Sequence, residues 1–114
     1  MSRVSIKATK VAPAEQETIA TYAVVTGSAL DASVCIALSY TILVADEDIK
    51  WKVMGANKAD YSDEVEVQAE ATVLADGVSS YAISNPPYAY YRVKVADNVG
   101  GTHGNVTVNG IAKG

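Results

Sequence analysis

The sequence predicts an all-β fold, an antiparallel β-sandwich or jelly roll of about seven to eight strands. Apolar and polar residues alternate with a period of two over much of the chain, which is typical of strands buried on one face. Short clusters of Gly, Pro, Asp and Asn separate these runs at the spacing of a sandwich or barrel. The length of 114 residues suits one domain, so we expect a single domain over residues 1–114, with residues 1–35 as an N-terminal arm or edge strands.

Four strands are predicted in the N-terminal half. Val4 and Ile6 alternate with polar residues near the start of the chain. The run TIATYAVV, residues 18–25, is rich in β-branched and aromatic residues and predicts a strand, with a helix beginning at Ala14 as the alternative. SYTILV, residues 39–44, is apolar on both faces and predicts a central strand. In IKWKV one face is apolar and the other is basic, with Ile49, Trp51 and Val53 opposed to Lys50 and Lys52.

The C-terminal half continues the alternation. In EVEVQAEATV, residues 64–73, Val and Ala alternate with acidic and polar residues, which predicts a half-buried strand with a solvated acidic face. SYAIS, residues 80–84, and NVTVNG, residues 105–110, each predict a further strand. ADG, residues 75–77, indicates a hairpin, because Asp-Gly readily supplies positive φ. NVGGTHG, residues 98–104, is predicted to be a flexible connection.

The segment PPYAYYRVKVA, residues 86–96, contains three of the seven tyrosines. Its prolines interrupt the strand ladder, because proline offers no N–H group. The residues that follow alternate, so the register divides the tyrosines into two populations. One face is predicted to point inward, with Tyr91, Val93 and Val95, and the other outward, with Tyr90, Arg92 and Lys94.

Composition and charge exclude several classes of function. The formal net charge is −4, so the chain would repel phosphate backbones, and nucleic-acid binding is not expected. No run of about 18 apolar residues is present, and the N-terminus lacks the apolar core of a signal peptide, so we expect no membrane association and synthesis in the cytoplasm. Charged residues make up 19% of the chain, and so low a proportion favours contact with a partner protein.

Few residues could perform catalysis or bind a cofactor or metal. The single cysteine, Cys35, lies in an apolar run and is predicted to be a buried, inert thiol. The single histidine, His103, lies in a glycine-rich loop that would hold it poorly, and we predict an exposed side chain. Asp46, Glu47 and Asp48 lack the spacing of a calcium loop and are interpreted as a solvated hairpin tip. We therefore expect neither an enzyme nor a cofactor-binding or metal-binding protein.

The large aromatic residues are expected to serve two purposes. The chain has no Phe, so Tyr and Trp must supply the large rings of the core. Strand register assigns four rings to the interior, Tyr40, Trp51, Tyr81 and Tyr91. Three other tyrosines fall in loops or on the outward register and are the candidate contact residues for a partner, Tyr61, Tyr88 and Tyr90.

Three segments together resemble a known class of protein. They are SYTILVADEDIKWKVMGAN, DEVEVQAEATVLADGVSSYAI and PPYAYYRVKVADNVGGTHGNVTVNGIAKG, the last of which we expect to contain a closing hairpin. Their order is similar to that in small all-β virion proteins of tailed bacteriophages and prophages, which decorate capsids or build neck, tail and fibre parts. The resemblance covers roughly residues 37–114, and its motifs are structural rather than catalytic.

The resemblance implies a virion structural protein that works by assembly. We expect a capsid decoration protein that binds and stabilises the assembled head, made in the cytoplasm of the bacterial host and located in the virion. Its expected partners are the major capsid protein or another virion protein and further copies of itself, with a trimer among the stoichiometries left open. The alternative is a carbohydrate-binding or receptor-binding sandwich of a tail or fibre, which would use the three candidate tyrosines and Trp51.

Overall fold

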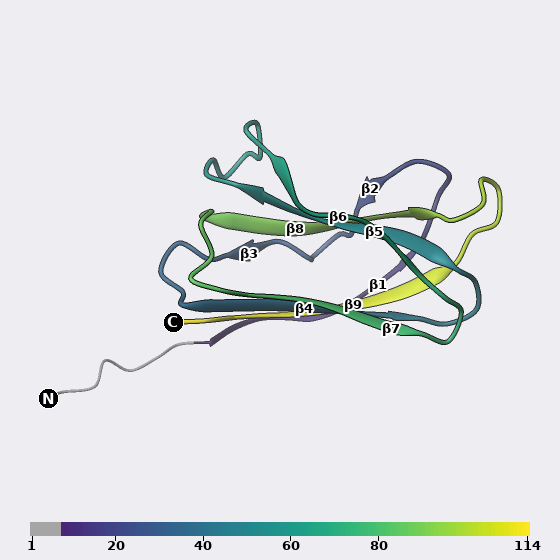
Figure 1. Ribbon diagram of the computed structural model, residues 1–114, viewed down its shortest axis with the longest axis horizontal. Coiled ribbons are helices and arrows are strands. Elements are labelled where there is room, and N and C mark those ends of the chain that lie inside the picture. The colour runs from purple at the N-terminus through teal and green to yellow at the C-terminus, as the bar shows by residue number, and fades with distance from the viewer. Residues whose placement is uncertain (1–7) are drawn as a thin grey trace, which may run out of the picture.

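The computed structural model describes residues 8–114 and confirms an all-β sandwich of two antiparallel sheets (Figure 1). Sheet A has the strand order β1-β9-β4-β7, and sheet B has the order β2-β8-β5-β6, with β3 also paired to β8. Within residues 8–114 there are nine strands: β1 (Ala8–Glu17), β2 (Ala23–Val24), β3 (Leu30–Asp31), β4 (Ala37–Val44), β5 (Ile49–Ala56), β6 (Val65–Val73), β7 (Val78–Ser84), β8 (Tyr90–Asp97) and β9 (Asn105–Lys113). No helix in this range is long and apolar enough to cross a membrane.

The strand pairing is that of a jelly roll. From the outermost pair to the innermost, β1 pairs with β9, β2 and β3 pair with β8, β4 pairs with β7, and β5 pairs with β6. Such nested antiparallel pairing describes one long hairpin rolled up so that its strands alternate between two packed sheets. The predicted fold class is therefore confirmed, with two very short strands, β2 and β3, raising the number of strands to nine.

The nested pairing overturns three predicted hairpins. Strands β6 and β7, on either side of residues 75–77, lie in different sheets, and so do β8 and β9. The turn at ADG exists, with the N–H of Gly77 donating to the carbonyl of Leu74 and a φ of 58° at Asp76, but it carries the chain across the sandwich. Asp46–Asp48 is likewise a crossing between β4 and β5 and not a hairpin tip. Among the described strands, two successive strands form a hairpin at β5–β6, which is closed by the loop over residues 57–64.

The predicted strand at residues 18–25 is also largely wrong. Only Ala23 and Val24 pair with β8, and the helix proposed to begin at Ala14 does not form, because β1 runs as a strand to Glu17. Residues 18–22 leave sheet A to reach sheet B, and they make isolated backbone hydrogen bonds in place of a continuous ladder, such as the one from the N–H of Asp97 to the carbonyl of Ile19. The predicted strand at residues 4–7 lies outside the described residues.

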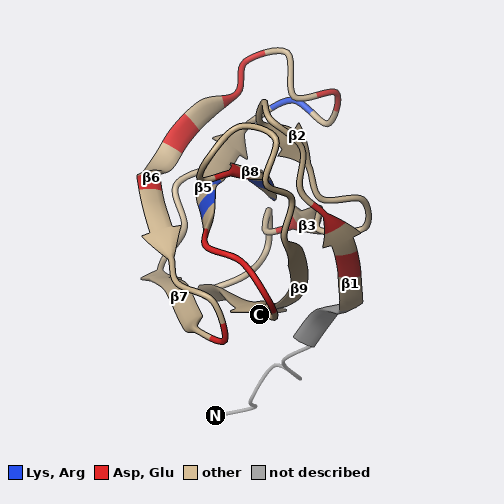
Figure 2. Cartoon of the chain, turned by 90° about the vertical axis from the view of Figure 1, so that its right-hand side faces the viewer, with Lys and Arg blue, Asp and Glu red and all other residues tan. Residues whose placement is uncertain are grey.

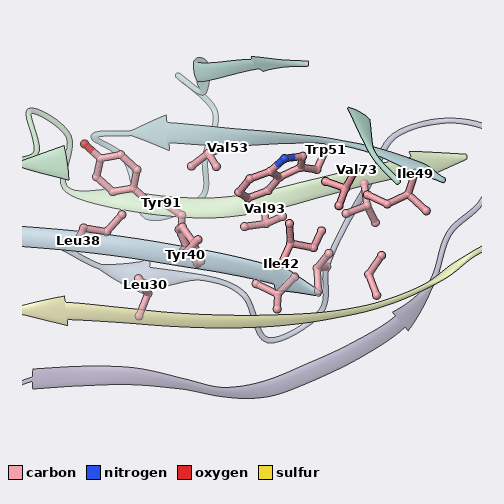
Figure 3. Packing of buried hydrophobic residues seen from close by; sticks show 14 of the residues in the cluster. Leu30, Leu38, Tyr40, Ile42, Ile49, Trp51, Val53, Val73, Tyr91 and Val93 are labelled. Atoms are coloured by element: carbon pink, nitrogen blue, oxygen red, sulfur yellow. The ribbon is translucent and has the colours of Figure 1, made fainter. Parts of the chain in front are cut away.

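The core lies between the two sheets and contains the predicted aromatic rings. Trp51, Tyr40 and Tyr91 are each 0% exposed and pack among valines, leucines and isoleucines from both sheets (Figure 3). Tyr81 is only partly buried and packs against the edge of this cluster. The indole N–H of Trp51 finds no acceptor among the described residues, so this ring contributes to the core by packing.

One buried hydroxyl connects the two sheets. Tyr40 extends from β4 of sheet A, and its hydroxyl donates to the carbonyl of Ser28 at 2.6 Å and lies 3.0 Å from the carbonyl of Tyr91 in sheet B. The ring is held against the backbone of β9 at Gly110, where a Cβ atom would approach two ring carbons to 2.8 Å. Glycine is therefore required at this position to admit the tyrosine ring.

The alternation predicted for β6 is interrupted. Strand β6 pairs with Ala71 opposite Trp51 but with Gln68 opposite Val53, so the register shifts between these pairs. A one-residue shift moves the following side chains to the opposite face of a strand. A second shift, between Val53 and Met54, restores the original alternation, so Val65 lies opposite Gly55. Val73 is buried as predicted, whereas Val65, at the first position of the strand, is 41% exposed.

The register of β8 generates the first prediction. Replacing Tyr91 by alanine should lower the free energy of unfolding by about 3–5 kcal/mol, because it removes a fully buried ring from a packed core. Tyr90→Ala, at the adjacent half-buried position on the opposite face, should cost much less. Urea unfolding of both variants measures the two costs. A larger loss for Tyr90→Ala than for Tyr91→Ala would contradict the register.

Candidate interaction surfaces

The outer face of sheet B carries charges that neutralise one another. Lysines on β5 reach carboxylates on β6, with Lys50 Nζ 3.6 Å from Glu70 Oε1 and Lys52 bonded to Glu66. On the same face Arg92 and Lys94 of β8 both bond Glu64. The acidic face predicted for residues 64–73 is therefore covered by the lysines and arginine predicted to point outward from the neighbouring strands.

Glu64 is the most enclosed carboxylate of this face. Burial would raise the pKa of its carboxyl, but hydrogen bonds from Arg92 and Lys94 outweigh burial and hold the pKa below its ordinary value. Tyr22 adds a further contact, since its hydroxyl donates to Glu70 at 2.7 Å and Lys52 Nζ lies 4.4 Å from the centre of its ring. This surface already satisfies its own charges.

The three candidate tyrosines gather at one end of the sandwich, near the start of β8. Tyr61 and Tyr90 meet edge to face with ring centres 6.3 Å apart, and Tyr88 meets the buried Tyr91 in the same way at 6.2 Å. The guanidinium of Arg92 lies 4.1 Å over the ring of Tyr61, whose hydroxyl donates to the carbonyl of Tyr91. All three are half-buried, and much of their surface is used inside the chain. Their role as partner contacts stays a prediction.

The outer face of sheet A is uncharged over three adjacent strands. The outward positions of β4, β7 and β9 hold small, hydroxylic, amide or aliphatic side chains, and the exception is Lys113 at the end of β9. These residues are Ala37, Ser39, Thr41 and Leu43 on β4, Val78, Ser80, Ala82 and Ser84 on β7, and Thr107, Asn109 and Ile111 on β9.

Two shallow hollows lie along this face. The first, of about 220 Å³, is lined by residues that include Ser39, Ala82 and Ile111. The second, of about 330 Å³, lies at the opposite end of β4 and is lined by residues that include Leu43 and Thr107. Sequence periodicity could have located this face, because each outward position on β4 and β7 is free of charge in the sequence.

His103 is held more firmly than its glycine-rich loop predicted. Its Nδ1 lies 2.9 Å from Oδ2 of Asp97, whose other oxygen accepts a hydrogen bond from the hydroxyl of Thr18 at 2.6 Å. The Thr18 hydroxyl in turn accepts the N–H of Gly104 at 2.8 Å. Asp97 is 1% exposed, and this buried carboxylate was not identified from the sequence. His103 itself is exposed, as predicted.

The remaining candidates for site chemistry lie apart. Cys35 was predicted to be buried but is only half-buried, in the turn before β4, and burial raises the pKa of its thiol. It adjoins Ile36, whose N–H donates to the carbonyl of Lys113 at the end of β9, whereas His103 precedes the start of β9. Among residues 8–114 no group of three His, Cys, Asp or Glu side chains is placed to hold a metal ion.

The comparisons with known proteins identify the fold. No protein-family model matches the chain, and none of the curated proteins matches its sequence. The chain is similar to a solved structure of the disulfide-linked pili of Bacillus endospore appendages, with a TM-score of 0.61 and 13% identity over 97% of this chain and 90% of that one. It is also similar to the SPBc2 prophage-derived protein YomS, with a TM-score of 0.61 and 10% identity over 100% and 99% of the two chains.

A third similarity is to a virus particle. A chain of the T13 IBDV viral particle matches with a TM-score of 0.50 and 6% identity, over 95% of this chain and 30% of that one. The TM-scores show a shared β-sandwich, and identities this low do not show a shared activity. The similar structures thus include a prophage protein, a viral particle and a pilus.

The network at Asp97 generates a prediction about pH. Burial would raise the pKa of Asp97, but hydrogen bonds from Thr18 and His103 outweigh it and hold the pKa below its ordinary value. A carboxyl whose folded pKa is lowered stabilises the fold above its unfolded pKa of about 3.9, and this stabilisation is lost as pH falls through the folded pKa.

Asp97→Asn should therefore be less stable than wild type at pH 7, and the difference should shrink as pH falls below about 4. Urea unfolding of both proteins at a series of pH values measures this difference. A difference that stays constant down to acid pH would show that the charge of Asp97 does not stabilise the fold.

Proposed function

We propose that this chain is a virion structural protein of a tailed bacteriophage or prophage, and specifically a capsid decoration protein that binds the assembled head. The observation that carries the proposal is the contrast between the two outer faces of the jelly roll. Sheet B presents charges that are already paired, whereas sheet A presents an uncharged surface over β9, β4 and β7. A surface with few charges can be covered by a partner at a small cost in desolvation.

The similar folds support this proposal. They include a prophage-derived protein, a chain of an icosahedral virus particle and a pilus subunit, and two of these three are named for assemblies. The resemblance in sequence to small virion proteins points in the same direction. We therefore propose the major capsid protein or another virion protein as partner, further copies of the chain as neighbours, and the virion as its location after synthesis in the bacterial cytoplasm.

We also propose that the protein is not an enzyme and needs no cofactor. Cys35 and His103 were the residues best suited to a nucleophile and a base, and they lie near opposite ends of β9. The partner of His103 is Asp97, which is itself bonded to Thr18. This arrangement supports a structural role in which His103 and Thr18 tie the loop before β9 to the ends of β1 and β8.

The alternative, a carbohydrate-binding or receptor-binding module, has less support. Trp51 is 0% exposed and has no face free for a sugar ring. The ring of Tyr61 is covered by Arg92. Tyr88 and Tyr90 are half-buried at the same end of the sandwich and are the residues on which this alternative depends.

A decoration protein acts through mass action. If it binds the assembled shell and not the free capsid protein, each bound copy shifts the equilibrium toward the shell. Many identical weak contacts suffice for this, because neighbouring copies on the shell are held at a high effective concentration.

The proposal is tested by co-sedimentation with purified shells of the phage or prophage that carries the gene. Thr41→Glu places a charge in the middle of the uncharged face, between Ser80 and Asn109, and should weaken shell binding by about tenfold or more, since a buried unpaired charge costs more than about 1.4 kcal/mol. The matched control is Thr72→Glu, which lies beside Lys50 on sheet B and should bind like wild type.

The two outcomes are distinct. Loss of binding for Thr41→Glu alone, with both variants folded by circular dichroism, supports the proposal. Equal binding by the two variants would overturn the assignment of sheet A as the contact face, and failure of the wild-type protein to bind shells would overturn the decoration role.

A further inference from the structure

The four edges of the two sheets differ in how freely they could pair with another chain. A free edge presents unpaired N–H and C=O groups and can pair with another chain, so proteins usually shorten, bend or charge their edges. The edges here are β1 and β7 in sheet A, and β6 and the pair β2 and β3 in sheet B.

Three of these edges are obstructed. Strand β1 contains Pro13, which lacks an N–H, within a register shift between Val11 and Ala14. Strands β2 and β3 have two residues each. Strand β6 has register shifts and carries Glu66 and Glu70, so two copies of it side by side would bring carboxylates together.

Strand β7 has none of these obstructions. Its seven residues, VSSYAIS, contain no charge, no Pro and no Gly, and they pair with β4 in one unbroken register. The absence of charge extends over residues 77–91 of the sequence. Figure 2 shows β7 without a charged residue, whereas β6 carries acidic bands.

The hydrogen bonds at the two ends of β7 identify its free backbone groups. The N–H of Val44 donates to the carbonyl of Gly77, and the N–H of Asn85 donates to the carbonyl of Ile36. In an antiparallel ladder such bonded positions recur at every second residue, so the odd-numbered residues of β7 face β4. The groups that point away from sheet A belong to the four exposed even-numbered residues, Val78, Ser80, Ala82 and Ser84.

We propose that β7 is a self-association strand, through which two copies of this chain pair antiparallel about a two-fold axis at Tyr81. A second copy brings the same edges, and among the described strands its open edge is again β7. The pairing places Val78 opposite Ser84 and Ser80 opposite Ala82 of the second copy, so that all free N–H and C=O groups of these four residues find partners. No like charges meet, because β7 has none.

The same pairing accounts for the partial exposure of Tyr81. At the axis the two Tyr81 residues would form a non-hydrogen-bonded pair, in which side chains approach most closely. Each ring would then be covered by its counterpart, as aromatic cross-strand pairs favour. Sheet A would continue across both copies and double the length of its uncharged outer face. A single such contact gives dimers, and a trimer would need a different surface.

Cross-linking tests the register. In a Cys35→Ser background, Tyr81→Cys places two thiols across the axis at a Cα separation of about 4.5–5.5 Å, which a disulfide can span. Ser79→Cys is the control on the same face of β7, since two copies of it would lie about 14 Å apart along the strands. We expect at least tenfold more disulfide dimer from Tyr81→Cys under mild oxidation. Equal yields from the two variants would overturn the proposed register.

Sedimentation of a proline variant tests whether copies pair through the edge of β7, and this test does not depend on Tyr81. Ala82→Pro removes one edge N–H that does not bond β4, so the sandwich should keep its circular dichroism spectrum and remain a monomer where wild type is a dimer. Ala82→Ser keeps the N–H and should dimerise like wild type. A monomeric wild-type protein, or a folded Ala82→Pro variant that still dimerises, would overturn the proposal.

This inference rests on the assembly part of the proposed function, but the two can fail separately. Wild-type dimers that cross-link through Tyr81→Cys and yet do not bind shells would retain the β7 contact and remove the decoration role. Shell binding that is unchanged in a folded Ala82→Pro variant, together with dimers that persist, would retain the decoration role and remove the β7 contact.

Discussion

The hydroxyl of Tyr40 is the polar contact on which the interior of the sandwich depends. It extends from the middle of sheet A to the carbonyls of Ser28 and Tyr91 on the opposite side of the core, and all three residues are 0% exposed. The ring fits because β9 has Gly110 beneath it. This one residue therefore fixes the separation of the two sheets and the register of β4 against β9, and with them the arrangement of both outer faces.

The two outer faces differ in charge because the alternate residues of each strand, those that do not point into the core, differ between the two sheets. Strands β5 and β8 turn their apolar residues into the core, so their lysines and arginine must cover sheet B, where the carboxylates of residues 64–70 neutralise them. Strands β4 and β7 turn Ser, Thr, Ala and Val outward and have no charge to present. The two faces of the molecule thus differ, since one carries charges that neutralise one another and the other is uncharged over β4 and β7.

Period-two patterns predicted which side chains are buried far better than they predicted which sheet each strand belongs to. They located Ile49, Trp51 and Val53 correctly and distinguished Tyr91 from Tyr90, because those faces are decided by neighbours in the sequence. They could not say which successive strands share a sheet, since a hairpin and a crossing use similar turn residues. The Asp97 network was missed because its partner Thr18 is 79 residues away.

The central positions of β8 and β9 in the two sheets affect the order in which the protein can fold during synthesis. Each lies between strands synthesised much earlier, β8 between β2 and β5, and β9 between β1 and β4. Sheet B cannot close before β8 is synthesised, and sheet A cannot close before β9 is synthesised. Contacts of such long sequence separation form slowly. Until then β1 and β4 expose the edges that β9 will occupy. A chain cut short before Asn105 would therefore keep both of these edges unpaired, and unpaired strand edges promote aggregation.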